Sequence, residues 1–320
     1  MRPNTLIGGM PTPGHPDSVS RRRLVLAAGL AALCPAVGFA DKVNANRPGA
    51  PPKLAVCLGS GGLHGFAHIG VIRAFERLGV RPDIICGTSV GAVVGVLWAA
   101  GFRANDIEAI AKEREWYELS WLRIPKLGFG TLNELRDALN RHIGGQRVES
   151  LPVRFAAVAT DLETGRPVIL DRGEPGRVAA ASASVPLRYE PVNIAGRKLV
   201  DGVLTAPVPV EAARALGADF CLAIDIAYRP DDEPVTGLSD VAYQAFHILI
   251  NRLIDEQIRR ADFAFRLDAH QFMRGDGGLQ NLVQQAEKSV YRSRADLIAA
   301  LSQAGITLSA NDGGEGCEMR

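Results

Sequence analysis

The sequence has few cysteines, and none of them is spaced as in a metal site. Its 320 residues include 5 cysteines and 6 histidines, with no Cys-x-x-Cys pair and no mixed Cys/His ligand spacing. Cys57, Cys86 and Cys221 fall inside apolar segments, where a thiol behaves as a small hydrophobic side chain. We therefore expect buried thiols, no metal site and no other cofactor.

An excess of charge of either sign is also absent. The chain carries 36 Lys and Arg against 35 Asp and Glu, for a formal net charge of +1. No long basic run follows the N-terminal region, so nothing in this balance indicates nucleic-acid binding. With 47% hydrophobic residues, the chain is long enough for one large domain with a sizeable core.

Residues 1–40 are typical of an export signal and not of a folded domain. Three arginines at 21–23 precede an apolar run over 24–40, and Ser-Arg-Arg-x-Leu resembles a twin-arginine signal. The run lies at the lower edge of the ~17–25 residues that span a bilayer, and Pro35 interrupts it. We predict export to the periplasm or out of the cell, with a membrane anchor at 24–40 as the alternative and a linker over 41–52.

A pattern of strand, glycine-rich turn and helix occurs twice between residues 53 and 100. The first unit predicts a strand over Leu54–Leu58 and a helix over 66–78, and the second a strand over 83–86 and a helix over 92–100. Because helices connect the strands, we expect the two strands to lie parallel in one sheet.

Ser89 stands at the centre of the second turn, between Gly87 and Gly91. A serine at a sharp strand-to-helix turn has a strained backbone and a hydroxyl lifted out of the sheet. The following helix directs its N-terminus at this serine, which favours negative charge there. The glycine-rich loop at 59–65 offers backbone N–H groups at the same edge, as a developing oxyanion requires. Together the two turns predict a nucleophile and an anion hole.

Five segments in chain order resemble the patatin-like phospholipase family. They are GSGGLHGFAHIG at 59–70, GTSVG at 87–91, DLETG at 161–165, ASASVP at 181–186 and Asp201-Gly202. Each short motif alone also occurs by chance in unrelated proteins, but the five segments in this order indicate the family.

This resemblance implies a serine lipid acyl hydrolase, of the phospholipase A or esterase type, that works through a Ser–Asp dyad without histidine. Ser89 would be the nucleophile and Asp201 the general base, ionised at neutral pH because an aspartate normally titrates near ~3.9. The N–H groups of Gly61, Gly62 and Leu63 would hold the oxyanion. The substrate would be a lipid or phospholipid, with peripheral membrane contact. The residues that support the motifs are Gly59, His64, Gly65, Gly87, Gly91 and Gly202.

Two positions depart from the family pattern. His64 stands where the family usually carries Arg or Lys, and Val203 stands where Gly or Ala often follows the Asp-Gly pair. Histidine titrates near pH ~6.5, so His64 is either a titratable charge beside the anion loop or a residue that packs against the first helix. We expect the second, because backbone N–H groups alone can form the hole.

The rest of the chain alternates strands and helices. This alternation predicts a three-layer α/β/α sandwich with a mostly parallel central sheet over 53–308, followed by a disordered tail over 309–320. Residues 240–266 have the stripe of one long amphipathic helix, which we expect to dock on the sheet in preference to a membrane surface. Two of the three tryptophans lie in 116–129, which either covers the core or lines an acyl-chain pocket. A last helix is predicted over 289–303.

Three alternatives remain open. An α/β-hydrolase with a Ser–Asp–His triad would use His247 or His270, but the serine turn comes too early in the chain for that fold. A dinucleotide-binding module would explain the glycines of 59–65, but no acid ends the second strand. A catalytically silent lipid-binding protein is the third, and the presence of both Ser89 and Asp201 argues against it.

Overall fold

The computed structural model describes residues 50–113, 130–227, 235–268 and 278–309. The predicted export signal and most of the linker lie outside the described residues. So do the aromatic stretch at 116–129, His270 and the tail from residue 310 onward.

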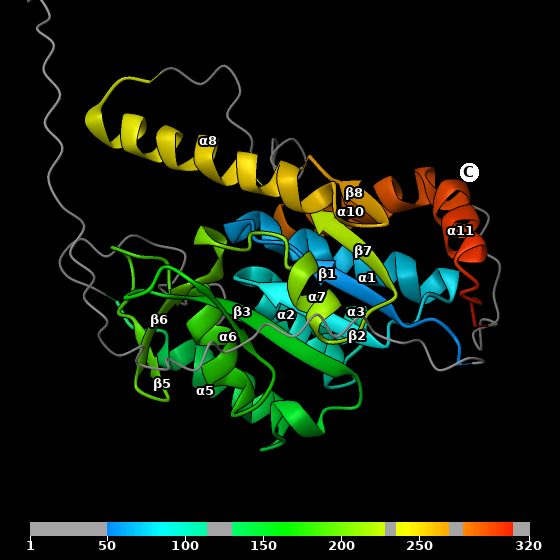
Figure 1. Ribbon diagram of the computed structural model, residues 1–320, viewed down its shortest axis with the longest axis horizontal. Helices are drawn as coiled ribbons and strands as arrows, with labels where there is room; N and C mark the ends of the chain where they lie inside the picture. Colours follow the sequence, from blue (N-terminus) through cyan, green and yellow to red (C-terminus); the bar gives the residue numbers. More distant parts are fainter. Residues whose placement is uncertain (1–49, 114–129, 228–234, 269–277, 310–320) are drawn as a thin grey trace, which may run out of the picture. The chain divides into compact units, whose positions relative to one another are not determined.

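The described strands form one sheet in the order β5-β6-β3-β2-β1-β7-β8, with β4 paired to β3 (Figure 1). The five strands β3, β2, β1, β7 and β8 are parallel, whereas β4, β5 and β6 are antiparallel additions at one side. The strands are β1 (Leu54–Leu58), β2 (Ile84–Thr88), β3 (Arg154–Asp161), β4 (Pro167–Leu170), β5 (Val192–Ile194), β6 (Arg197–Asp201), β7 (Phe220–Asp225) and β8 (Phe263–Arg266).

Helices cover both faces of this sheet. The helices are α1 (Ala67–Leu78), α2 (Val90–Ala99), α3 (Ala104–Lys112), α5 (Asn133–Ile143), α6 (Pro175–Ala183), α7 (Val210–Ala215), α8 (Leu238–Ile258), α10 (Gly278–Arg292) and α11 (Arg294–Gln303). Short 3-10 helices are η1 (Gly62–Phe66), η3 (Val148–Ser150) and η4 (Gly202–Leu204). The predicted three-layer α/β/α sandwich with a mostly parallel sheet is confirmed.

The central strands are apolar on both faces because both faces are covered. In β1, Leu54, Val56 and Leu58 enter the larger core with α1, α2, α6 and α10. Ala55 and Cys57 point the other way, into a smaller core under α7 and α8. Cys57, Cys86 and Cys221 are free and fully buried, as expected.

Two predicted helices are wrong in extent. The helix predicted over 240–266 ends at Ile258, and Phe263–Arg266 is a strand paired in parallel with β7. A four-residue strand is too short for a period of two to stand out against a helical stripe, and its two phenylalanines favour a strand. The helix predicted over 289–303 is two helices, α10 and α11, of which α10 packs along α1.

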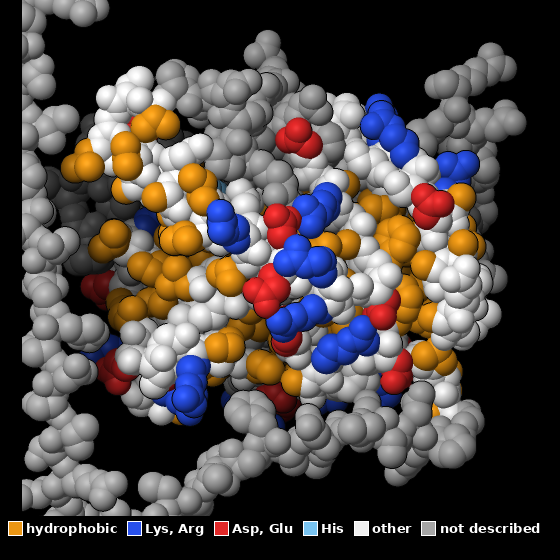
Figure 2. Space-filling view, turned by 45° about the horizontal axis from the view of Figure 1, so that its top comes forward, with side chains coloured by type: hydrophobic (Ala, Val, Ile, Leu, Met, Phe, Trp, Pro, Cys, Tyr) orange, Lys and Arg blue, Asp and Glu red, His pale blue; other side chains and the backbone are white. Residues whose placement is uncertain are grey.

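Helix α8 docks on the sheet over only part of its length. Ile250, Ile254 and Gln257 are buried, whereas most of the first three turns are exposed. Figure 2 shows hydrophobic side chains gathered where α8 begins, with charged side chains toward its other end. Within the residues that the structure describes, no helix combines the length and the apolar character needed to cross a membrane.

Candidate active site

Ser89 follows β2 and caps the N-terminus of α2 with a backbone that non-glycine residues rarely adopt. Its φ is 57° and its ψ is −125°. The turn depends on its two glycines, because a Cβ at Gly87 would lie 2.4 Å from the carbonyl oxygen of Gly91. A Cβ at Gly91 would lie 2.2 Å from the carbonyl oxygen of Leu58. Both positions therefore exclude a side chain.

Ser89 Oγ donates a hydrogen bond to Asp201 Oδ2 over 2.7 Å. Asp201 ends β6, beside Ala159 of β3, whereas Ser89 follows β2, so the fold brings together two residues that are 112 positions apart in the chain. Both side chains are buried, with 6% of Ser89 and 1% of Asp201 exposed. The structure therefore brings together the two residues that the sequence marked as nucleophile and base.

Burial changes the expected charge of Asp201. Loss of solvent raises its pKa from 3.8 to about 7, although hydrogen bonds from the Val203 N–H and the Ser89 hydroxyl lower it. The Val203 N–H donates to Asp201 Oδ1 over 2.8 Å. The expectation of a carboxylate fully ionised at neutral pH was based on the ordinary aspartate pKa and is corrected here. Asp201 is poised to hold or release a proton near pH 7.

Helix α6 positions both members of the pair. The Ser89 N–H donates to Ser182 Oγ over 2.9 Å, and Ser182 Oγ donates to the carbonyl oxygen of Val158 over 2.6 Å. The Asp201 N–H donates to the carbonyl oxygen of Ser184 over 2.8 Å. Sequence reasoning noted the segment 181–186 but did not single out Ser182. The available signal was a serine in the alanine-rich C-terminal half of α6.

The glycine-rich loop runs from the end of β1 into η1. The Gly59 N–H donates to the Ile224 carbonyl over 3.0 Å, and buried His68 Nε2 lies 2.8 Å from the Gly59 carbonyl. Burial lowers the pKa of His68 to about 4, so its neutral ring donates that bond at neutral pH. Gly62 has a φ of 55°. Because Gly62 and Leu63 open η1, their N–H groups have no partner within that helix.

His64 lies in η1, close to His247 of α8. Burial lowers the pKa of His247, and the charge of His64 lowers it further. The His247 ring packs against Tyr243 with centroids 4.2 Å apart. Of the two histidines that the triad alternative could use, His247 lies near His64 of the anion loop and His270 lies outside the described residues, while the Ser89 hydroxyl bonds directly to Asp201.

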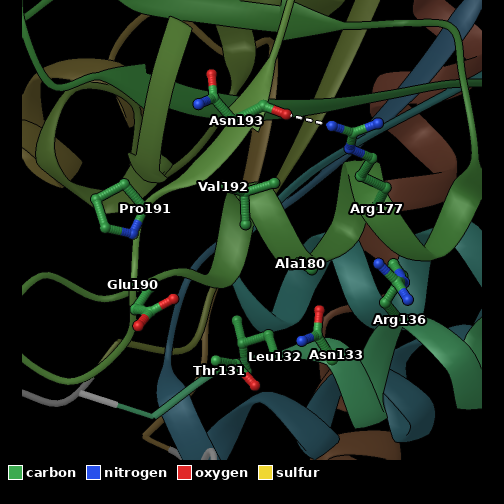
Figure 3. Close-up of a pocket in the computed structure, with 10 residues that line it drawn as sticks. All are labelled: Thr131, Leu132, Asn133, Arg136, Arg177, Ala180, Glu190, Pro191, Val192 and Asn193. Carbon is green, nitrogen blue, oxygen red and sulfur yellow. Dashed lines mark hydrogen bonds between the residues drawn. The ribbon is translucent and has the colours of Figure 1, made fainter. Parts of the chain in front are cut away.

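A separate hollow of about 360 Å³ lies between α5, α6 and β5 (Figure 3). Arg136, Arg177, Glu190 and Asn193 are among the residues that line it. The Arg177 guanidinium donates to the Asn193 carbonyl. Neither Ser89 nor Asp201 lines this hollow. Among the described residues, no group of three or more His, Cys, Asp or Glu side chains is placed to hold a metal ion.

Comparison with known proteins agrees with this geometry. Residues 56–214 match the family model described as patatin-like phospholipase. An uncharacterized NTE family protein of Mycobacterium tuberculosis (strain ATCC 25618 / H37Rv) is 35% identical over 183 residues, which are 56% of this chain and 51% of that protein. The lysophospholipase nte1 of Aspergillus fumigatus is 29% identical over 187 residues, which are 57% of this chain and 12% of that protein.

The chain thus spans about half the length of the mycobacterial relatives that it matches. Among solved structures, VipD from Legionella pneumophila has a TM-score of 0.43 and 12% sequence identity. That match covers 77% of this chain and 67% of VipD.

Proposed function

The chain belongs to the patatin-like phospholipase family through residues 56–214, and from this premise we propose that it is a serine hydrolase of lipid carboxylic esters. Ser89 acts as the nucleophile and Asp201 as the general base. The observation that carries the proposal is the 2.7 Å hydrogen bond from Ser89 Oγ to a buried carboxyl oxygen. The names of the relatives suggest a lysophospholipid as one substrate to test.

In the first half of the reaction, Asp201 accepts the proton of the Ser89 hydroxyl while Oγ attacks the ester carbonyl. The carbonyl oxygen becomes an oxyanion, which the N–H groups of Gly61, Gly62 and Leu63 stabilise. When the tetrahedral intermediate collapses, the C–O bond to the alcohol breaks. Asp201 returns its proton to the leaving oxygen, and an acyl group remains on Ser89.

In the second half, Asp201 removes a proton from water, which attacks the acyl carbonyl. The same N–H groups hold the second oxyanion, and the proton returns to Ser89 Oγ as the fatty acid leaves. A pKa of about 7 for Asp201 suits a group that must both accept and donate a proton near neutral pH. The N-terminus of α2 adds a positive dipole end beside Ser89.

The direct Ser89–Asp201 contact supports a dyad in preference to a triad, since no imidazole stands between hydroxyl and carboxyl. It also argues against a silent lipid-binding protein, because binding alone does not require a strained serine bonded to a buried acid. We retain export by residues 1–40 as part of the proposal.

Covalent labelling tests the proposal together with an ester panel. A fluorophosphonate should label the wild type but not Ser89→Ala, and Asp201→Asn should be labelled much more slowly. The wild type should hydrolyse members of a panel of short-chain esters, phospholipids and a lysophospholipid, and Ser89→Ala should hydrolyse none of them. Ser302→Ala, at an exposed serine of α11, is the matched control and should behave as wild type. Equal labelling of Ser89→Ala would refute the nucleophile.

A further inference from the structure

The first three turns of α8 expose a continuous apolar stripe. Leu238, Val241, Ala242, Ala245, Ile248 and Leu249, here called the outer stripe, recur at spacings of three and four residues, so they share one face of the helix. All six are exposed, with 87% of Leu238 and 64% of Leu249 accessible to solvent. Isolated exposed leucines are ordinary, but a stripe of this length marks a surface that contacts something apolar.

Apart from Asp240 at its first turn, the charged residues of α8 lie in its C-terminal half. Residues 241–251 contain no Asp, Glu, Lys or Arg. Asp240 is occupied as a cap, since it accepts hydrogen bonds from the N–H groups of Thr236 and Gly237. After this segment the next charged residue is Arg252. Just beyond the C-terminus of α8, Arg260 forms ion pairs with Glu256 of α8 and Glu211 of α7. An uncharged stripe that ends at a charged belt matches the acyl region and the headgroup level of a lipid surface.

Helix α8 interacts with two segments of the proposed site, η1 and the chain that follows Asp201. At the first, His247 lies close enough to His64 of η1 to be affected by its charge. At the second, Gln257 accepts a hydrogen bond from the Val208 N–H and donates one to the Thr205 carbonyl. These two bonds fix the segment that follows Asp201. The outer stripe therefore lies on a helix that is hydrogen-bonded to the segment after Asp201 and has His247 near His64 of the anion loop.

Two further leucines are exposed on segments that belong to the proposed site. Leu63, in the loop assigned to the oxyanion, is 40% exposed. Leu187 is 90% exposed and has a φ of 67°, which is costly for a residue with a branched side chain. It follows Ser184, whose carbonyl oxygen binds the Asp201 N–H, by three residues. A strained, unburied leucine gains nothing from packing, so its placement favours a role in binding.

We propose that the outer stripe of α8, with Leu63 and Leu187, is the surface by which this protein docks on the uncharged acyl region of a lipid surface. The inference rests on the proposed function, because a hydrolase of water-insoluble lipid esters takes its substrate from aggregated lipid. Docking at this face places the lipid beside the loop of Leu63 and the segment after Asp201. Since residues 241–251 of α8 contain no Asp, Glu, Lys or Arg, we expect attraction to anionic headgroups to contribute little to docking by the outer stripe and apolar burial to supply the affinity.

The test measures binding of the full chain to phosphatidylcholine vesicles by co-sedimentation. All variants carry Ser89→Ala, so that binding is read without hydrolysis. Leu238→Asp combined with Leu249→Asp should lower the partition coefficient at least about ten-fold, since each removes a leucine from the lipid and adds a charge. Leu187→Asp should lower it several-fold. Binding should change little when salt rises from about 0.1 M to about 1 M.

Ile298→Asp provides the matched control, because it places the same charge at an exposed isoleucine of α11. It should bind like the parent, and circular dichroism should show all variants folded. The proposal is overturned if the double variant binds as the parent does, as it would if residues 24–40 alone held the vesicle. It also fails if Ile298→Asp is equally impaired, if binding requires anionic lipid, or if the stripe variants only turn an oligomer into a monomer.

Activity gives an independent readout in the background with Ser89 intact. The stripe variants should retain hydrolysis of a soluble short-chain ester and lose hydrolysis of vesicle lipid. If the wild type hydrolyses no ester, the proposed function fails, yet vesicle binding can still be measured. If the wild type is active and the variants hydrolyse both substrates equally, only the docking surface is refuted.

Discussion

The backbone N–H of Ser89 donates a hydrogen bond to the side-chain oxygen of Ser182 over 2.9 Å. That bond links the strained serine turn to a helix 93 residues later in the chain. Ser182 is fully buried, and its hydroxyl in turn donates to the Val158 carbonyl of β3. The orientation of the nucleophile is therefore set by a residue that does not contact the reacting groups.

Ser182→Ala should slow catalysis without removing the nucleophile. The change leaves the buried Ser89 N–H without its acceptor, which typically costs about 1–3 kcal/mol. We expect kcat to fall about ten-fold or more, with KM nearly unchanged and with slower fluorophosphonate labelling. Ser184→Ala is the matched control, because the Ser184 hydroxyl donates to the Ala180 carbonyl of α6 and so does not hold the Ser89 turn. Equal losses in both variants would show a general packing effect.

The pH–rate profile should report the ionisation of Asp201. Its raised pKa of about 7 means that the carboxyl holds a proton below neutrality and cannot act as a base. The value of kcat/KM on a soluble ester should therefore fall about ten-fold per pH unit below pH 7 and reach a plateau above it. An aspartate with an ordinary pKa of about 3.9 stays ionised from about pH 5 to about pH 7. A flat profile over that range would therefore contradict the raised pKa of Asp201.

Asp201→Asn should stabilise the fold at alkaline pH more than at acidic pH. Because the folded-state pKa of this acid is raised, the folded protein retains a proton that the unfolded chain has lost. Wild-type stability therefore falls as pH rises from 3.8 to about 7 and stays low above that. Between these two pH values, the contribution of Asp201 lowers the free energy of unfolding by roughly 4 kcal/mol. Urea unfolding of both proteins at acidic and alkaline pH measures it. A difference that is constant with pH would refute the raised pKa.

The N-terminal proposal is tested by cell fractionation. Arg21→Lys combined with Arg22→Lys should leave the protein in the cytoplasm, since a twin-arginine signal requires both arginines. The single replacement Arg23→Lys preserves the pair and serves as the control. Export of the double variant at the wild-type level would refute the twin-arginine interpretation. It would leave open export by another signal.

Local patterns predicted the two strand–turn–helix units well. β1 was predicted with its observed bounds, and the first residue of α2 differs by two from the prediction. Glycine spacing and short apolar runs determine such units through backbone sterics, which act within a few residues. The Ser89–Asp201 pair was also predicted, but only through the ordered set of family motifs. No local pattern could place two residues 112 positions apart in contact.

What the sequence did not predict depends on tertiary context. Ser182 and His68 are ordinary helix residues in the sequence, and only the fold brings them to the Ser89 N–H and the Gly59 carbonyl. The pKa of Asp201 follows from burial, which its neighbours in sequence do not specify. Strand β8 is too short for its own pattern to stand out beside the helical stripe of α8, and its pairing with β7 is a contact that only the fold shows.

His64 provides the last prediction, because it replaces the basic residue that the family usually carries. Its backbone N–H donates to the Gly61 carbonyl within η1, and its side chain lies near His247 of α8. We therefore expect it to support the loop and not to supply charge to the oxyanion. The pH–rate profiles of the wild type, His64→Arg and His64→Gln should be parallel, each with the single rise near pH 7 that belongs to Asp201. Their plateaus should differ by less than about three-fold, since replacing a side chain outside the backbone hole removes no oxyanion donor.

If a protonated His64 did stabilise the oxyanion, its charge would be lost as pH rises. The wild type would then give a bell-shaped profile, His64→Arg would keep its plateau at high pH, and His64→Gln would be slow throughout. That three-way pattern would assign His64 to the mechanism and refute the structural role.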